Sequence, residues 1–274
     1  MKIEAHAKVN LTLEVFGARP DGYHALRSLV VPISLSDTLH VEPSDVLSSD
    51  TGYPDDLILK AARALDPSRG AEIRVEKRIP AGGGLGGGSS DAAAALVALN
   101  GLWGLGRSRE ELCEIGAQVG SDVPSLVLGG PVVMQGRGEV VERVECQRLD
   151  LVLVNPGVHT STRDVYSRCS PRGLSSPSAT AACLAALASG DLHGIAASFA
   201  NDLTVPACRL HPQIADAMSS LRAAGAVGVA MSGSGSSVFG LVESAARAQS
   251  VVASLSAKGL SAWAVHTLST DDAA

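Results

Sequence analysis

A glycine-rich segment from Pro80 to Asp91 contains the residues whose types and spacing most clearly indicate chemistry. Glycine runs cost chain entropy, but they let the backbone approach a ligand and aim successive N–H groups at one anion. An alanine-rich helix follows directly, and a helix N-terminus favours negative charge. The segment therefore predicts a phosphate site, to which Ser89 and Ser90 add hydroxyl donors while Ser90 or Asp91 caps the helix. A flexible connection with a serine or aspartate cap is the structural alternative. The predicted contacts are Pro80, Gly82, Gly83, Gly84, Leu85, Gly86, Gly87, Gly88, Ser89 and Ser90.

This loop differs from the two best-known phosphate loops. A Walker A loop, G-x-x-x-x-G-K-[ST], needs a lysine, and the segment has none. Gly82, Gly84 and Gly87 match the dinucleotide pattern G-x-G-x-x-G, but a glycine run matches it by chance. No acidic residue ends a strand about 20 residues later, as that fold requires. Positive charge for the phosphates must therefore come from elsewhere in a chain with few lysines: Lys2, Lys8, Lys60, Lys77 and Lys258.

The elements that must position this loop alternate between strands and helices, which predicts an α+β fold. The predicted strands cover 2–17, 23–43 (with breaks at Pro32 and at Ser36–Asp37), 71–80, a hairpin in 131–144, 150–157, two strands in 228–243, and 261–268. The predicted helices cover 57–65 (after Asp55–Asp56), 89–105, 108–120 (with a capping box from Ser108 to Glu111), 180–190, 192–201, 212–225 and 244–259. The later half resembles a split β-α-β-β-α-β sandwich with extra helices. The segment that begins at 150 therefore opens a second half of the chain, and no convincing linker separates the two halves.

Composition limits the class of protein further. The chain has 274 residues and a formal net charge of −6 without a basic stripe, which argues against nucleic acid as the main partner. No stretch approaches the roughly 20 apolar residues that span a bilayer, and the N-terminus is not a secretory signal. The odd number of cysteines, 5, and the lack of a metal-ligand cluster indicate reduced thiols and no zinc site. We expect a cytoplasmic protein without membrane partners, whose oligomeric state the sequence leaves open.

Three motifs together resemble those of a known family. AKVNL (7–11), GGGLGGGSSDAA (82–93) and MSGSGSSVFG (231–240) are similar, in order and separation, to the three motifs of the GHMP kinases. Three shorter segments resemble the members of that family whose acceptor carries a cytidine diphosphate group: RPDGYH (19–24), VGSDVP (119–124) and NPGV (155–158). The resemblance covers nearly the whole chain.

The resemblance implies an N-terminal ATP-binding domain, 1–150, like ribosomal protein S5 and a ferredoxin-like C-terminal domain, 151–274. It places the active site in the cleft between the two domains. It also implies ATP and Mg²⁺ as cofactors and transfer of the γ-phosphoryl group to the 2-hydroxyl of 4-diphosphocytidyl-2-C-methyl-D-erythritol, in the non-mevalonate pathway to isoprenoid precursors. Lys8 and Asp122 match the family's catalytic residues. A carboxylate there can accept the hydroxyl proton, while the ammonium orients the nucleophile. As alternatives, Asp122 is an N-cap and Lys8 a solvated strand residue.

The resemblance also assigns residues to the acceptor. Tyr23 and His24 would contact the cytosine, since an aromatic face stacks on a base and an imidazole bonds its edge. Tyr166 would cover the opposite face of the base, and Thr162 would lie near the ligand. Asn10 shares a strand face with Lys8 and would contact the erythritol hydroxyls. The alternative interpretation is that Tyr23 and Tyr166 are half-buried residues with a structural role, which is common for tyrosine.

Two departures from the family pattern bear on these assignments. His6 stands where proline is usual, and Asp56 where asparagine is common beside the adenine site, so the adenine contacts stay open. No acidic metal ligand lies near the loop, so Mg²⁺ would bind through phosphates, water and a serine, and its protein ligands are unknown. The Ser-Gly turn at 233–237 is a simple strand connection that, by resemblance, also closes over the phosphate loop or the acceptor site.

Three other functions are alternatives to this one. Another GHMP kinase, acting on homoserine, mevalonate or a sugar, is the nearest rival, but DGYH and SDVP argue against it. A nicotinamide-dependent oxidoreductase would use Gly82, Gly84 and Gly87 but lacks the acidic ribose partner. A nucleotide-binding module without turnover is hard to reconcile with the presence of both Lys8 and Asp122.

Overall fold

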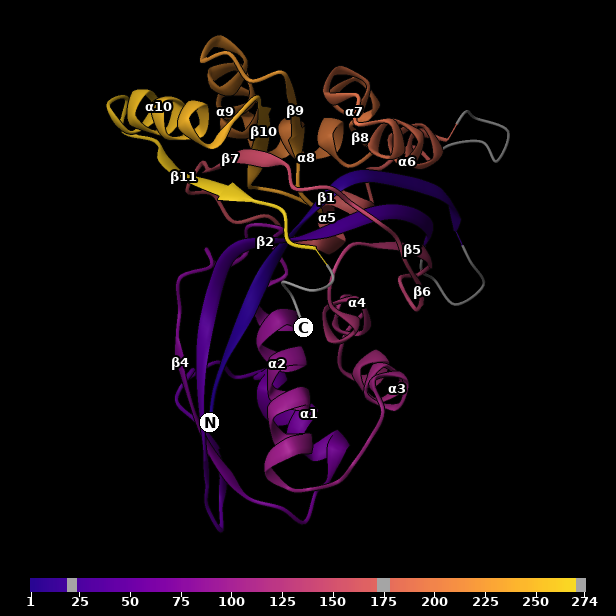
Figure 1. Cartoon of the computed structure of the whole chain (residues 1–274), viewed down its shortest axis with the longest axis vertical. Coiled ribbons are helices and arrows are strands. Elements are labelled where there is room, and N and C mark those ends of the chain that lie inside the picture. Colours follow the sequence, from indigo (N-terminus) through magenta and orange to yellow (C-terminus); the bar gives the residue numbers. More distant parts are fainter. Residues whose placement is uncertain (19–23, 172–177, 270–274) are drawn as a thin grey trace.

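Two mainly antiparallel sheets with helices packed against them form the structure, a computed structural model that describes residues 1–18, 24–171 and 178–269 (Figure 1). This architecture confirms the predicted α+β class. Over the described ranges the first sheet has seven strands in the order β3-β4-β2-β1-β8, with β5 on β2 and β6 on β5. These strands are β1 (Lys2–Ala18), β2 (His24–Pro43), β3 (Leu47–Ser49), β4 (Ala71–Glu76), β5 (Val132–Gly136), β6 (Val140–Arg143) and β8 (Ala200–Asn201).

The long β1–β2 pair places the first motif. Lys8 pairs with Pro32 and Asn10 with Val30, and the register shifts on both sides of this pair of residues. Such irregularities re-aim side chains that a regular strand would alternate. The predicted breaks in the second strand are wrong, because β2 runs unbroken through Pro32 and Asp37. The irregular register accommodates the proline, and the carboxylate of Asp37 is satisfied by backbone amides of a neighbouring segment.

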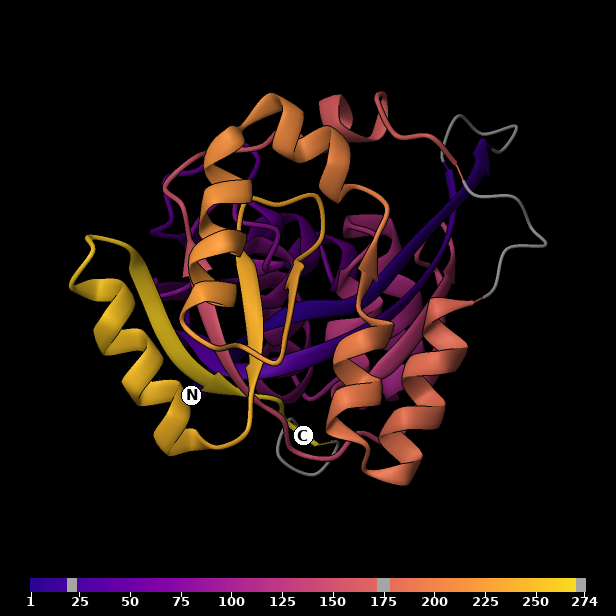
Figure 2. The same ribbon diagram turned by 90° about the horizontal axis from the view of Figure 1, so that it is seen from above.

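The second sheet is antiparallel throughout, in the order β11-β7-β10-β9. Its strands are β7 (Asp150–Asn155), β9 (Gly228–Met231), β10 (Val238–Val242) and β11 (Ser261–His266). Figure 2 shows α9 (Pro212–Ala223) and α10 (Ala245–Ser256) lying over this sheet. The order β7-α9-β9-β10-α10-β11 is the predicted split β-α-β-β-α-β sandwich, which is thereby confirmed.

The remaining helices flank the two sheets, as Figure 1 shows. They are α1 (Leu57–Leu65), α2 (Gly87–Leu102), α3 (Arg109–Val119), α4 (Val123–Leu128), α5 (Thr162–Tyr166), α6 (Ala179–Ser189), α7 (Leu192–Ser198) and α8 (Thr204–Leu210). Asp56 caps α1, and the capping box of Ser108 and Glu111 begins α3 as predicted. The short helices α4, α5 and α8 were not predicted. None of the helices in the described ranges has the length and apolar character to cross a membrane, and all five cysteines are free thiols.

One hydrophobic cluster joins the two halves of the chain. It includes Leu11 and Leu29 from the first sheet and Leu151 and Phe239 from the second, and all four are fully buried. Burying a side chain of this size contributes about 1.5–3 kcal/mol. The predicted division at residue 150 stays a prediction, but packing across it holds the two sheets in one fixed arrangement.

Candidate active site

A cavity of about 1460 Å³ brings the three motifs together. Its walls come from β1, the glycine loop, the segment before α4, the segment 159–167 and the turn 233–235. Pockets for one small ligand usually measure about 300–1000 Å³, so this cavity has room for two.

Lys8 and Asp122 face each other in this cavity. Lys8 Nζ lies 3.5 Å from Asp122 Oδ2, and their side chains are 5% and 35% exposed. The ammonium therefore lies inside the protein, while the carboxylate is open to the cavity.

Asp122 occupies the N-cap position of α4, yet its side chain makes no capping hydrogen bond. The interpretation of this carboxylate as an N-cap is therefore wrong. The helix begins instead with Pro124 in its first turn, and the carbonyl of Asp122 accepts a bond from Ser125 Oγ at 2.7 Å. The carboxylate is therefore available to pair with Lys8 and to bind a ligand in the cavity.

A hydrogen-bond chain fixes Lys8 in place. Lys8 Nζ donates to Asn10 Oδ1 at 2.7 Å, and Asn10 Nδ2 donates to Ser28 Oγ at 2.8 Å. The same Asn10 oxygen accepts the backbone N–H of Gly233 at 3.0 Å, which connects the first motif to the third. The interpretation of Lys8 as a solvated residue is wrong, because it is 4% exposed.

The glycine loop adopts the conformations that only glycine tolerates readily. Gly82, Gly84 and Gly86 have φ values of 64°, 73° and 71°. A Cβ on Gly84 would lie 2.2 Å from the carbonyl oxygen of Ser232, so the third motif already fills that space. The loop is thus a closely packed backbone surface rather than a flexible connection.

Helix α2 starts earlier than predicted and without a side-chain cap. Its N-cap is Gly86, so the first N–H groups of the helix are left for a ligand. The predicted caps are wrong: Ser90 Oγ donates to the carbonyl of His6, and Asp91 binds Lys77. Ser90 is buried and does not line the cavity, whereas Ser89 and the other predicted loop residues do.

The third motif closes over the loop, as its resemblance predicted. Ser232 Oγ donates to the carbonyl of Gly84 at 2.9 Å, and the N–H of Ser237 donates to the carbonyl of Gly83 at 3.0 Å. With the bond from Gly233 to Asn10, the turn touches both the phosphate loop and the first motif.

Four of the acceptor residues predicted from the resemblance line the same cavity: Asn10, His24, Thr162 and Tyr166. The rings of His24 and Tyr166 lie 5.8 Å apart between centroids and are tilted by 37°. Burial raises the pKa of the Tyr166 phenol, and the nearby Asp122 carboxylate raises it further, so this hydroxyl stays protonated. Thr162 shares a hydrogen bond of 2.9 Å with Ser234. Tyr23 lies outside the described residues.

An ion cluster of one partly exposed lysine and two buried carboxylates, which the sequence did not reveal, supports the start of α2. Lys77 Nζ donates to Asp37 and, at 2.7 Å, to Asp91. A Cβ on Gly87 would lie 3.7 Å from this Nζ, so the ammonium lies beside the first turn of α2. Burial raises the pKa of Asp91 to about 6, although Lys77 acts in the opposite direction. In the sequence Lys77 belongs to a charged run at a strand end, which is typical of solvated residues.

Comparison with known families identifies the chain. The GHMP kinases N terminal domain matches residues 56–130, and the GHMP kinases C terminal domain matches residues 183–260. The chain belongs to the GHMP kinases. A 4-diphosphocytidyl-2-C-methyl-D-erythritol kinase of Pelotomaculum thermopropionicum is 42% identical to this GHMP kinase, and the match covers 91% of each chain. An enzyme with the same name from Symbiobacterium thermophilum is 40% identical, with 98% and 100% covered.

Solved structures agree with this assignment. The crystal structure of a 4-(cytidine 5'-diphospho)-2C-methyl-D-erythritol kinase has a TM-score of 0.85 and 38% identity to this GHMP kinase, over 97% of this chain and 99% of that one. A homoserine kinase from Cytophaga hutchinsonii has a TM-score of 0.78 at 21% identity, over 100% of this chain and 96% of the other. That second likeness shows the shared fold alone.

Proposed function

We propose that this GHMP kinase transfers the γ-phosphoryl group of ATP to the 2-hydroxyl of 4-diphosphocytidyl-2-C-methyl-D-erythritol. The observation that carries the proposal is the Lys8–Asp122 pair, which opens into the same cavity as the uncapped start of α2. Relatives at about 40% identity over most of the chain bear the name of that enzyme and support this choice of acceptor.

The phosphates of ATP would bind along residues 82–89. The free N–H groups at the start of α2 and the positive-φ glycines of the loop before it fit a polyphosphate. Ser89 adds a hydroxyl at the same wall.

In the reaction, Asp122 would accept the proton of the attacking hydroxyl. Lys8, held by Asn10, would orient that oxygen and offset the negative charge that develops during transfer. Phosphoryl transfer depends mainly on positioning and electrostatics, so a fixed ammonium, a carboxylate and an amide cradle are sufficient protein groups.

The cytidine group would bind beside His24 and Tyr166. A base lying against the two rings gains stacking, and the imidazole can bond its edge. Asn10 and Thr162 would contact the erythritol end and its phosphates, and Tyr23, next to His24 in the chain, would add the second aromatic face.

Mg²⁺ would be held mainly by the phosphates. Within the described ranges, no group of three or more His, Cys, Asp or Glu side chains could hold a metal by itself. The Ser89 hydroxyl is the side-chain oxygen at the loop that fits this role. When bound, Mg²⁺ would neutralise charge on the β- and γ-phosphates.

A coupled ADP-release assay with ATP, Mg²⁺ and the cytidine acceptor tests the proposal. We expect acceptor-dependent ADP release and a product one phosphoryl group heavier by mass spectrometry. Homoserine, mevalonate and galactose serve as rival acceptors. Release no greater than with ATP alone, or a higher kcat/KM for one of these rivals, would overturn the assigned substrate.

A further inference from the structure

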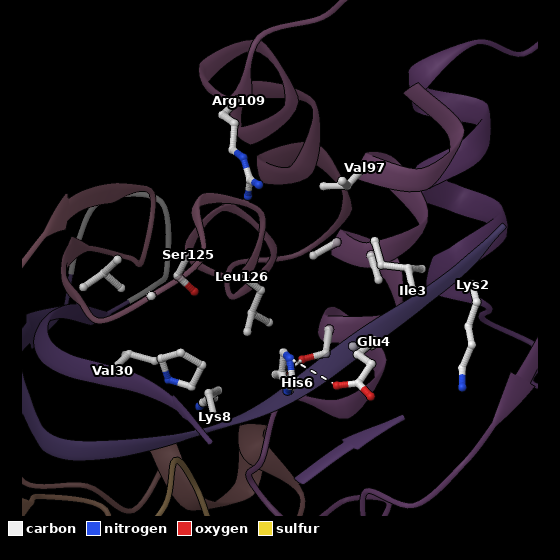
Figure 3. A pocket seen from close by; sticks show the side chains of 18 residues that line it. Lys2, Ile3, Glu4, His6, Lys8, Val30, Val97, Arg109, Ser125 and Leu126 are labelled. Atoms are coloured by element: carbon white, nitrogen blue, oxygen red, sulfur yellow. Dashed lines mark hydrogen bonds and ion pairs between the residues drawn. The ribbon is translucent and has the colours of Figure 1, made fainter. Parts of the chain in front are cut away.

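A second cavity of about 360 Å³ lies behind the catalytic pair, between the first half of β1 and helices α2 and α4 (Figure 3). We call it the back cavity; His6, Lys8, Ala94, Arg109 and Ser125 are among the residues that line it. Lys8 alone, of the described residues, lines both this cavity and the large one. The volume lies near the lower end of the usual range for small-molecule pockets, about 300–1000 Å³.

Arg109 gives the back cavity a positive group. Its side chain reaches from α3 toward β1 (Figure 3), and Nη1 donates to the carbonyl of Val127 at 2.8 Å. A guanidinium has five N–H donors, so most of them are left for a ligand. Among the residues that the structure describes, no acidic side chain forms an ion pair with Arg109. A half-buried arginine without a carboxylate partner suits an anion.

The other walls are mixed, because the charged side chains of Lys2 and Glu4 line the cavity beside a larger number of apolar residues. Ala93, Ala94 and Val97 of α2 face Leu126 of α4 across the cavity. Burial lowers the pKa of His6, so its imidazole carries no charge at neutral pH although Glu4 acts in the opposite direction. The apolar residues of these walls fit the short hydrocarbon body of a ligand.

Hydrogen bonds of two residues that line the back cavity connect it to elements of the reaction site. Ser125 Oγ donates to the carbonyl of Asp122 at 2.7 Å, and Ser90 Oγ, near the start of α2, donates to the carbonyl of His6. Lys8 on β1 and Asp122 before α4 belong to two of the elements that border the cavity, so an occupant that moves either element changes the distance between them. Because catalysis depends on sub-ångström placement, such a displacement slows transfer.

We propose that the back cavity is a regulatory site for a small organic anion with a short hydrocarbon body, held by Arg109. Its occupant lowers the turnover of the kinase by separating Lys8 from Asp122, without competing for the substrate cavity. The two anionic probes in the experiment below distinguish a carboxylate head group from a phosphate head group.

The first experiment measures binding by titration calorimetry, with the large cavity filled by a non-hydrolysable ATP analogue and CDP. The probes are 4-methylpentanoate and isopentyl phosphate, and 4-methylpentanamide is the neutral control. We expect saturable binding of at least one anion at one site per chain and at least about tenfold weaker binding of the amide. Arg109→Gln should weaken binding of the anion about tenfold or more, whereas Arg109→Lys should retain most of the affinity. Arg107→Gln, a change at an exposed arginine, is the matched control and should leave the affinity unchanged.

Failure of both anions to saturate would overturn the proposal. So would equal affinity for the amide, an unchanged affinity in a folded Arg109→Gln variant, or displacement of the probe by the ATP analogue. The binding measurement needs no turnover, so its failure is distinct from failure of the proposed function.

The second experiment measures initial rates with the bound probe. We expect kcat to fall while the KM values of ATP and acceptor stay constant, and Arg109→Gln to abolish this inhibition. Competitive inhibition against either substrate would overturn the site, and binding without any change in kcat would overturn its regulatory role.

Discussion

Replacing Asp122 by asparagine separates the catalytic role of this carboxylate from any structural one. Asparagine has nearly the same size and caps helices as well as aspartate. The carboxylate makes no capping bond in the structure, so the fold loses little in this variant. What the variant loses is the ability to accept a proton from the acceptor hydroxyl.

The expected loss in kcat is about 10²–10⁴-fold, the usual contribution of a general base. This corresponds to about 3–5 kcal/mol in activation free energy. The attraction across the 3.5 Å between Lys8 Nζ and Asp122 Oδ2 is worth about 1 kcal/mol in water and about 5 kcal/mol at an effective dielectric constant of 20. Because the Asp122 side chain is 35% exposed, the lower part of that range applies, and Lys8 keeps its bond to Asn10.

The assay compares Asp122→Asn with wild type by coupled ADP release and by calorimetric ATP binding. We expect the ATP Kd to change less than about threefold, since the phosphate loop is a separate wall of the cavity. Asp216→Asn, an exposed change on α9, is the matched control and should leave kcat unchanged. A kcat for Asp122→Asn within a few-fold of wild type would refute the role of Asp122 as the base.

Three further changes test the structure around the site. Gly84→Ala should raise the KM for ATP at least tenfold and lower the melting temperature, because φ is 73° and the new Cβ would lie 2.2 Å from a carbonyl oxygen; an unchanged KM would contradict the packed loop. Glu14 accepts bonds from the N-terminus of α6, including the N–H of Ala179, and its pKa is lowered by those bonds against its burial. Its stabilisation is present above the unfolded pKa and is lost as pH falls through the lower folded value. Glu14→Gln should therefore cost about 1–3 kcal/mol at pH 7 and less below pH 4 in chemical denaturation; a cost that does not depend on pH would contradict it. The pH dependence of stability that Asp91 causes has the opposite sign to that of Glu14. The pKa of Asp91 in the folded protein is raised to about 6, so the protein becomes less stable as pH rises from about 4 to 6. Asp91→Asn should thus raise the unfolding free energy at pH 7.5 but not at pH 4, and a loss at pH 7.5 would refute that sign.

Local sequence patterns were sufficient for most elements and for the character of the phosphate loop. Alternation predicted β1, and the glycine run followed by an alanine-rich stretch predicted an anion site before α2. The first residue of α2 could not be predicted, because it depends on the positive φ of Gly86. Since the helix starts at Gly87, Ser90 falls on its inner face and bonds β1 instead of lining the site.

Contacts between distant segments were beyond those patterns. Lys77 looks like a solvated strand residue, and only the packing of β2 against α2 shows that Asp37 and Asp91 enclose it. The pairing of Lys8 with Asp122 was expected through family resemblance, since no local pattern relates a strand at the N-terminus to the start of a short helix. The short helix α4 was itself missed, and with it the reason why the Asp122 side chain is free.

The scarcity of lysine has a physical explanation in this arrangement. Both lysines that line the large cavity in the described part of the chain already face carboxylates: Lys8 faces Asp122, and Lys77 faces Asp37 and Asp91. Neither cation is then a free charge for polyphosphate, and the attraction must come from the N–H groups of residues 82–89 and the N-terminus of α2. Backbone dipoles are fixed by the fold and cost no reorganisation when the phosphates bind. Because the loop supplies this attraction, Lys8 can stay committed to Asp122 and Asn10, where the reacting hydroxyl would lie.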